Sequence, residues 1–582
     1  MNSQTPYNVP LIRPSIVLYP RSRPLVMSLS DKLTYTDSSG SENLKETIDL
    51  YSYHEQNAGR LIINPEEARI ELGEEVASRL KLTKDGTKVL WPQPTDSPLD
   101  PQNWSERQKT VHLLILILVS IVPDFDSGLG IAALFPLAQA FNTNVNVINN
   151  VSSNWSIFLI GIGGIFAVMA MRKFGRLPVL FWSQIFGLAF LIGCTFSPNL
   201  STFAAMRCLN SFFATTPQVT GLFVVTDMYP FHQQAKKINS WTFGFIISPF
   251  LSPFACGFLA ARENWRWTYA TGCFYSLFVI ILMALFMKET MYDRTLKPIP
   301  VPETTGLRNR VETLFGITGW KMAKYRAPWK QIVTDPIRIV WRPHVLPVLV
   351  FEAALFGFGI GINVTNVVFL GEPLPLGYGF DAIMISALYA TPIVAVLIGE
   401  LVGHFLNDWI MERGIRKNSG VHEAESRFWA CYLGIPLFIC GFLLIGASFQ
   451  NHLPLAAIII GWGIAEFSIM IMTVVVYAPE LLMLSFPTSP DSHLDRLPND
   501  ALDMFDLTYY HQTTQGEVSA LVTLARILGG FAVAYFQVPW AAKYGAIQTY
   551  GVEAAIVSAL FLFFIPLIQL KGRRFRKYYS LQ

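Results

Sequence analysis

The sequence predicts an all-α membrane protein with twelve transmembrane helices in two six-helix lobes. One reason is composition: 52% of the 582 residues are hydrophobic and only 15% are charged, whereas about a quarter of the residues of a soluble protein are charged. The other reason is the distribution of apolar residues. Twelve segments reach the length of about 20 residues that a spanning helix needs, six on each side of a basic, polar stretch.

These segments define the expected domains. The spans lie near 110–135, 150–171, 178–197, 201–226, 238–261, 267–287, 344–370, 382–406, 427–448, 453–481, 513–537 and 545–570. The lobes are therefore 110–287 and 344–570, joined by a central loop, 288–343. Two lobes of six spans are typical of transporters whose substrate site lies between the lobes near the membrane midplane.

The remaining segments are polar. Residues 1–109 are expected to form a largely disordered tail, and 571–582 a short basic tail. Residues 485–512 form an acidic insertion in which apolar residues recur at spacings of three and four, as in an amphipathic helix at a membrane surface. A variable loop insertion is the alternative interpretation.

Lysine and arginine are distributed unequally among the loops. Basic residues concentrate in the C-terminal tail, the central loop and the loops that would face the same side, whereas three lie in the opposite loops: Arg262, Arg266 and Lys543. Because basic loops face the cytosol, both termini are expected to be cytosolic. The polar N-terminus also predicts that the first span serves as its own insertion signal.

Several classes of function are disfavoured. A net charge of +3 is too small to indicate nucleic-acid binding, and the six cysteines all lie in predicted spans without metal-ligand spacing. No P-loop, nucleophile elbow or histidine cluster is found, so an enzyme is not expected. We expect no cofactor and no metal.

The segment before the first span carries a recognisable motif. Asp100-Pro-Gln-Asn-Trp104-Ser, followed by Lys109, resembles the pre-membrane signature of fungal major facilitator transporters, in particular their twelve-spanner drug:proton antiporter group. The resemblance covers residues 90–575. It implies alternating access, with spans one, four, seven and ten lining the cavity.

Loops on one side resemble the gate motifs of this family. Arg172-Lys-Phe-Gly175-Arg176 follows span two, although Arg172 stands where the family has an aspartate. The matching loop of the second lobe retains an acid at Asp408. The gating residues that the resemblance implies there are Asp408, Arg413 and Arg427; solvated helix ends are the alternative.

Spans four and five match the family in part. Span four begins with Arg207 and ends with Asp227, and both are assigned to gating. Pro253 and Gly257 match the antiporter motif of span five, whereas Ser252 and Cys256 replace glycines. Antiport is therefore not implied. The double-proline form is similar to members related to histidinol and polyamine uptake.

Span one contains two carboxylates. A charge at the bilayer centre costs roughly 2.5–3.5 kcal/mol on insertion scales, so each needs a cavity or a partner. Asp124 aligns with Ser120 and Ser127, which favours the cavity. Asp126 is rotated by about 200° and aligns with small residues, which favours a helix–helix contact; a proton-coupling role is also assigned to it. A kink at Pro123 would change this geometry.

Span seven carries polar residues on one face. Glu352, Phe356, Gly359, Asn363 and Asn366 follow one another at spacings of 4, 3, 4 and 3, so they share a face. A substrate-binding wall is the preferred interpretation, and a polar seam between helices is the alternative.

Other membrane-embedded groups complete the candidate site. Glu466 in span ten is a candidate for proton coupling, because burial favours its neutral form. Glu400 is assigned to the gate or a seam. Arg207 and Arg526 need anionic partners, for which Asp227 and Glu466 are candidates. Three aromatic residues are candidates for contact with an organic cation: Trp155, Trp241 and Trp462.

The function expected from these features is secondary transport. The substrate would be a cationic or amphiphilic small molecule, such as a polyamine, amino alcohol or drug, because carboxylates outnumber arginines in the spans. Protons and the lipid bilayer are the other expected partners of a monomer in the plasma membrane or, alternatively, the vacuolar membrane. A non-transporting nutrient sensor that signals through its N-terminal tail is the alternative function.

Overall fold

The computed structural model describes residues 65–579 except 73, 79, 91, 295–305, 342–344, 375–376, 418–427 and 484–513. It divides into two compact units. The described part of the smaller unit, 65–89, contains α3 (Pro65–Leu72), α4 (Glu74–Ala77) and a β-bridge between Leu82 and Val89. The larger unit, described from 90 onward, contains the bundle. The acidic insertion and most of the N-terminal tail lie outside the described residues.

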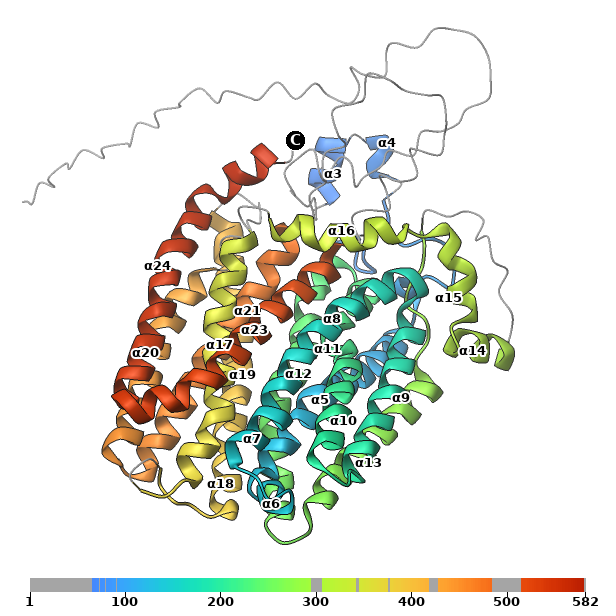
Figure 1. Ribbon diagram of the computed structural model, residues 1–582. Coiled ribbons are helices and arrows are strands. Elements are labelled where there is room, and N and C mark those ends of the chain that lie inside the picture. The colour runs from blue at the N-terminus through green and yellow to red at the C-terminus, as the bar shows by residue number, and fades with distance from the viewer. Residues whose placement is uncertain are drawn as a thin grey trace, which may run out of the picture. The chain divides into compact units, whose positions relative to one another are not determined.

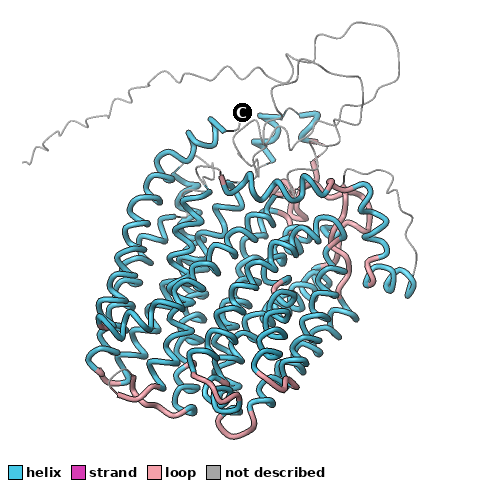
Figure 2. Tube along the Cα trace, viewed as in Figure 1, coloured by secondary structure: helices cyan, strands magenta, loops and turns pink. Residues whose placement is uncertain are grey.

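Long helices make up the larger unit (Figures 1 and 2). The first half contains η1 (Pro101–Asn103), α5 (Glu106–Ala132), α6 (Leu134–Ala140), α7 (Val145–Asn149), the π-helix η2 (Asn150–Asn154), α8 (Trp155–Phe174), α9 (Arg176–Thr195), α10 (Leu200–Ala214), α11 (Thr216–Met228), α12 (Phe231–Ala260) and α13 (Trp265–Phe286). The central loop contains α14 (Gly306–Leu314), α15 (Ile317–Met322), the 3-10 helix η3 (Ala323–Tyr325) and α16 (Trp329–Val340). The second half contains α17 (Val345–Gly371), α18 (Ala382–Leu388), α19 (Ala390–Lys417), α20 (Trp429–Asn451), α21 (Leu455–Met483), α23 (Thr514–Tyr544) and α24 (Ala546–Tyr579).

The all-α membrane class is confirmed. Eleven helices in the described part of the chain are long and apolar enough to cross a membrane. Helices suit this role because their backbone groups bond within one segment, where lipid offers no partners. Only 33% of the most apolar stretch of α13 is buried within the protein, which leaves its large apolar side chains to face lipid.

The fourth predicted span differs from the expectation of one continuous helix. It consists of α10 and α11, joined at Thr215, whose backbone is still close to helical. Pro217 sits in the first turn of α11 and has no N–H to donate to the preceding turn. The interruption divides the span into helices of 15 and 13 residues.

The two halves touch near both ends of the bundle. Figure 1 shows α16 lying across one end, which we call the α16 end, and α6 and α18 at the opposite end. At the α16 end, the Phe223 ring of α11 occupies the space where Gly516 of α23 would carry a Cβ. At the opposite end, Gly257 of α12 lies directly against Ser386 of α18. The two halves are therefore in contact on either side of the space between them.

Helices α17 and α23 approach so closely that their backbones touch. A Cβ on Gly357 would lie 2.6 Å from the backbone carbon of Gly529, and one on Gly529 would collide with the carbonyl oxygen of Ala353. Real Cβ atoms do not approach backbone this closely, so only glycine fits.

We therefore expect Gly529→Ala to lower the thermal stability of the purified protein, at a cost of about 1–3 kcal/mol typical of overpacking. The matched control is Gly403→Ala in α19, because a Cβ there meets no atom within 4 Å and alanine favours the helix by up to about 1 kcal/mol. Thermal unfolding in detergent measures both. Equal shifts of the midpoint for the two variants would contradict the tight contact.

Candidate functional site

A central cavity lies between the two halves of the bundle. It contains about 930 Å³ of atom-free space, part of it open to solvent, and is lined by residues of α5, α8, α11, α12, α17, α21 and α23. The polar lining residues are Asp124, Ser127, Gln218, Asn363, Glu466, Thr523 and Arg526. Aromatic and aliphatic side chains supply the rest, including Phe245, Phe250, Phe356 and Met470. A mostly apolar space with a few polar groups is typical of a small-molecule site.

Two carboxylates reach the cavity from opposite halves. Asp124 on α5 accepts a hydrogen bond of 2.8 Å from the amide nitrogen of Gln218 on α11. Glu466 on α21 accepts a hydrogen bond of 3.2 Å from the indole nitrogen of Trp462, one turn earlier. Neither bond comes from a cation.

The arginine of the cavity is paired with a buried acid. Arg526 Nε on α23 donates to Glu352 Oε2 on α17 at 2.8 Å, and both side chains are almost fully buried. The guanidinium also lies 3.8 Å from the centre of the Phe356 ring. The sequence suggested Asp227 or Glu466 as partners of Arg526, and Glu352 replaces them because α17 and α23 are in backbone contact.

The span-seven face is divided between the cavity and its support. Phe356 and Asn363 line the cavity, whereas Glu352 binds Arg526. Asn366 is fully buried, and neither of its amide atoms has a hydrogen-bond partner among the described residues. This face is thus part cavity wall and part contact between helices.

A second polar network lies inside the first half. The side-chain Nδ2 of Asn210 on α10 donates to Asp126 Oδ2 at 3.1 Å, and the side-chain Oδ1 of Asn210 accepts from Arg207 at 2.5 Å. Arg207 also donates to the carbonyl oxygen of Ser152 at 3.1 Å. Asp126 therefore lies among neighbouring helices and not among the cavity-lining residues. The side-chain amide of Asn210 stands between Asp126 and Arg207.

The three candidate tryptophans occupy different environments, and none is among the described residues that line the cavity. Trp241 is fully buried and donates to the carbonyl oxygen of Pro217 at 3.3 Å. Trp462 is also buried and supports Glu466. Trp155 is 45% exposed and packs against Phe531 of the other half.

Three charged side chains meet at the α16 end. Arg172, at the end of α8, pairs with Asp335 of α16 at 2.9 Å and with Glu517 at the start of α23. All three are at least 97% buried. The Arg172 cation is thus matched by acids from the central loop and the second half.

Two acids hold Gly175 and Arg176, one at the start of the central loop and one in the first half. Gly175 has φ 105°, a backbone conformation that favours glycine, and a Cβ there would lie 2.8 Å from Glu289 Oε2. Glu289 accepts from the backbone amides of Arg176 and Leu177, the first residues of α9. Burial raises the pKa of Glu289, although the backbone amides of Met291 and Arg176 favour its ionised form. Arg176 Nε in turn donates to Asp227 at 3.1 Å.

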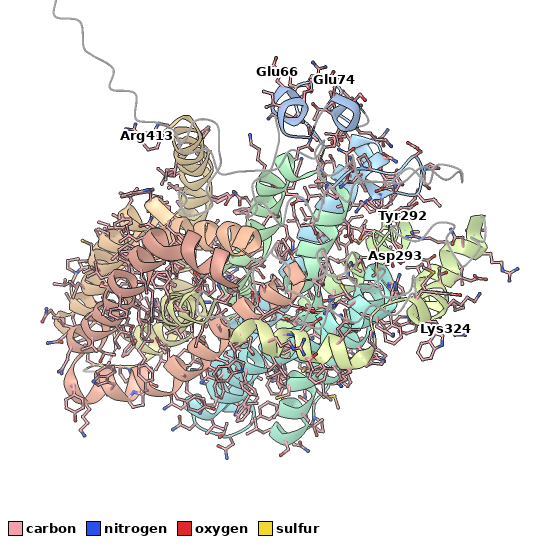
Figure 3. All side chains as sticks on the ribbon, turned by 90° about the horizontal axis from the view of Figure 1, so that it is seen from above. Glu66, Glu74, Tyr292, Asp293, Lys324 and Arg413 are labelled. Atoms are coloured by element: carbon pink, nitrogen blue, oxygen red, sulfur yellow. The ribbon has the colours of Figure 1, made fainter. Side chains whose placement is uncertain are left out.

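The other predicted gating residues are not brought together. Pro253 packs where Gly128 of α5 has no side chain, and Gly257 contacts Ser386. Glu400 lies within α19, with no hydrogen-bond partner for Oε2 among the described residues. Arg413 lies over the ring of Trp409 at the end of α19, apart from Tyr292 and Asp293 (Figure 3). The Asp408 side chain and all of Arg427 lie outside the described residues.

The pre-membrane motif, which begins at Asp100, is bound to the loop that follows α13. Asp100 is fully buried and pairs with Arg294 at 2.9 Å. It also accepts from the backbone amides of Thr95 and Gln102. Burial alone would raise the pKa of Asp100, but Arg294 and these amides together hold it below its ordinary value.

A pH-dependent stability contribution is expected from Asp100. Because its folded-state pKa is lowered, the contribution is complete above the unfolded value of about 3.9 and is lost as pH falls through the folded value. Asp100→Asn should cost about 1.5–3 kcal/mol at pH 7, as for a hydrogen bond to a charged group, and progressively less below pH 4. Thermal unfolding of both proteins from pH 7 to pH 3 measures this. A difference that stays constant over the range would contradict it.

Several residues of the site were not predicted from the sequence. Gln218 and Thr523 are neutral and give no signal in an apolar span. Asp335, Glu517 and Glu289 stand at or beyond the ends of spans, where acids are usually solvated. The sequence did contain one indication. Arg172 stands where the resemblance leads us to expect an aspartate, and a buried arginine requires anions nearby, which Asp335 and Glu517 supply.

The chain is similar to known transport proteins. Residues 116–485 match the family model of the Major Facilitator Superfamily. The relatives include MFS transporter fsa7 of Fusarium sp. (strain FN080326), 24% identical over 59% of this chain and 66% of that protein. Efflux pump radE of Floropilus chiversii is 22% identical over 78% of this chain and 83% of that protein. Efflux pump vrtL of Penicillium aethiopicum is 25% identical over 72% of this chain and 79% of that protein.

Solved structures of similar fold include the proton:xylose symporter XylE bound to 6-bromo-6-deoxy-D-glucose, with a TM-score of 0.54 and 14% identity over 80% of this chain and 97% of that chain. For a mutant of the peptide transporter POT, the TM-score is 0.52 and the sequence identity 11%, over 79% of this chain and 95% of that chain. At such identities the likeness concerns the fold alone. With a family model that covers more than half of its length and a bundle of matching architecture, this chain belongs to the Major Facilitator Superfamily and is a secondary transporter.

Proposed function

We propose that this transporter moves a cationic or amphiphilic organic solute through the central cavity and couples its movement to protons. The observation that carries the proposal is the charge of the cavity. Asp124 and Glu466 face it from opposite halves and accept their hydrogen bonds from uncharged groups, whereas Arg526, whose charge also acts on Asp124, is paired with Glu352. A solute with a positive group would be attracted to these carboxylates, and the aromatic walls suit an apolar body.

For proton coupling we propose Glu466, with Asp126 as a second candidate. A buried carboxylate accepts a proton readily because burial penalises its charged form. Glu466 can exchange a proton for the substrate directly, since it lies in the cavity wall. Asp126 lies deeper, next to the amide of Asn210.

Export is the direction we propose, because relatives of similar length are described as efflux pumps. We place the protein in the plasma membrane as a monomer with both termini in the cytosol. The basic loops on one side and the basic C-terminal tail support that orientation.

Proteoliposomes containing the purified protein test this function, with radiolabelled spermidine and fluorescent ethidium as cationic probes and an imposed pH gradient as the driving force. We expect Glu466→Gln to retain exchange of probe down its own gradient but to lose accumulation driven by protons. Asp124→Asn should weaken binding in both modes.

The matched control is Glu553→Gln in α24, because Glu553 is also a buried carboxylate but is bonded by Gln537 and does not line the cavity. Proton-driven accumulation that is equal in Glu466→Gln and Glu553→Gln would refute the coupling role. Binding of neither probe, together with binding of an organic anion, would refute the substrate class.

A further inference from the structure

The helices of the central loop expose two apolar stripes. Leu307, Val311 and Phe315 recur every four residues along α14 and just beyond it. Along α16 the same spacing gives Trp329, Val333, Ile337 and Trp341. These seven side chains are 43% to 85% exposed, and residues four apart share one face of a helix. We call them, with the basic residues between them, the α14–α16 surface.

These helices are tied to the ends of membrane-spanning helices. Arg310 of α14 donates to backbone carbonyls of Met283, Ala284 and Met287, where α13 ends. The backbone of Gly319 in α15 lies against the last residue of α8, Phe174, whose ring stacks on Trp320. The loop helices therefore lie at the depth where the spans leave the hydrocarbon.

Helix α16 is fixed at the same level. Its buried face includes Ile332 and Ile339, and Asp335 on that face reaches Arg172 near the end of α8. The stripe from Trp329 to Trp341 is on the other side of the helix. Packing against the bundle thus accounts for one face of α16. Apart from the contact between the rings of Trp329 and Phe174, the apolar stripe is left exposed by the described residues.

The surface carries positive charge. Seven basic and two acidic residues lie between Gly306 and Trp341, and both acids are in ion pairs, with Arg308 and Arg172. Lys321, Lys324, Lys330 and Arg338 are exposed. Tryptophan with lysine and arginine beside an apolar stripe is typical of helices that lie in the interface of a membrane with anionic lipids.

We propose that the α14–α16 surface lies in the interface of the bilayer and binds anionic lipid headgroups through Lys330, Arg338 and the neighbouring lysines. The apolar stripes enter the boundary between headgroups and acyl chains, and the basic side chains meet the phosphates. This proposal is independent of which solute the cavity carries.

Fluorescence quenching of the full-length protein in lipid nanodiscs tests the contact. The exposed Cys440 is first changed to serine, and an environment-sensitive fluorophore is attached at Ile337→Cys. The matched control site is Arg413→Cys, ten residues beyond the spanning stretch of α19, which is about 15 Å along a helix. Nitroxide-labelled lipids should quench the label at 337 and not at 413. Quenching of both labels by aqueous iodide alone would overturn the proposal.

The charge preference is tested with the same label. Nitroxide-labelled phosphatidylglycerol should quench it more than nitroxide-labelled phosphatidylcholine at equal mole fraction. In Lys330→Glu/Arg338→Glu this preference should fall by about fivefold for each basic side chain, whereas the equally charged control Lys84→Glu/Lys88→Glu should retain it. An unchanged preference in the first variant would overturn the anionic-lipid assignment.

One further outcome identifies a different occupant. If the label at 337 is shielded from iodide but insensitive to nitroxide lipids, and deletion of residues 486–511 exposes it, a segment of this chain covers the stripe. That result would also overturn the proposal.

Discussion

Replacing Arg526 with methionine is expected to destabilise the protein by about 3–5 kcal/mol, because it leaves the buried carboxylate of Glu352 without its cation. The pair joins α17 to α23 at 2.8 Å, and both side chains are at most 3% exposed. Methionine keeps much of the volume of the arginine side chain, so the loss of stability reflects the missing charge and not a new cavity. Denaturation of the purified protein in detergent measures it.

The control for this effect is the double variant Glu352→Gln/Arg526→Met. It removes both charges, and replacing a complete buried pair by neutral groups is often close to neutral in stability. We therefore expect the double variant to be more stable than Arg526→Met alone. If the double variant were the less stable of the two, Glu352 would not be the partner whose charge Arg526 compensates.

Arg172→Leu is expected to shift the protein toward states that are open at the α16 end. The substitution removes the cation that lies between Asp335 and Glu517, which come from α16 and α23. Breaking a buried pair costs about 3–5 kcal/mol, which amounts to a shift of more than about a hundredfold in a two-state equilibrium. The shift favours the open arrangement because water can solvate the two acids there.

The rate at which a thiol reagent modifies Thr523→Cys measures the opening, since Thr523 lines the cavity. We expect faster modification in Arg172→Leu, and recovery toward the original rate when Glu517→Gln is added. Arg262→Leu, which removes an exposed arginine in the loop between α12 and α13, serves as the control. An unchanged rate in Arg172→Leu would show that the charge cluster does not hold this end closed.

Helix positions, and which residues of one helix share a face, could be predicted because they depend on local spacing. Two residues along a helix turn by about 200°, which is why Asp124 reaches the cavity while Asp126 lies among its neighbours. The break at Thr215 was missed because Pro217 lies inside an otherwise continuous apolar run. In such a run, hydropathy does not distinguish one helix from two.

Partners that come from distant parts of the chain could not be predicted. Arg172 and Glu517 are separated by most of the sequence, and no spacing rule relates them. The candidate tryptophans show the same limit, since sequence does not reveal whether an aromatic ring faces a cavity or packs against a neighbouring backbone. Trp241, against Gly221, is the clearest example.

Helix α23 is attached to opposite halves of the molecule at two heights. Glu517 and Ser519 near its start contact Arg172 and Val219 of the first half, whereas Arg526 holds it to α17 of the second half. The two attachments are separated by nine residues, about 13 Å along the helix axis. The pair with Glu352 can therefore act as a fulcrum, and a tilt of about 10° around it would move the start of α23 by about 2 Å. That displacement is enough to break the contacts of Glu517 and Ser519 with the first half, so the start of α23 can be released while its pivot, and the packing of Phe531 against Trp155, hold.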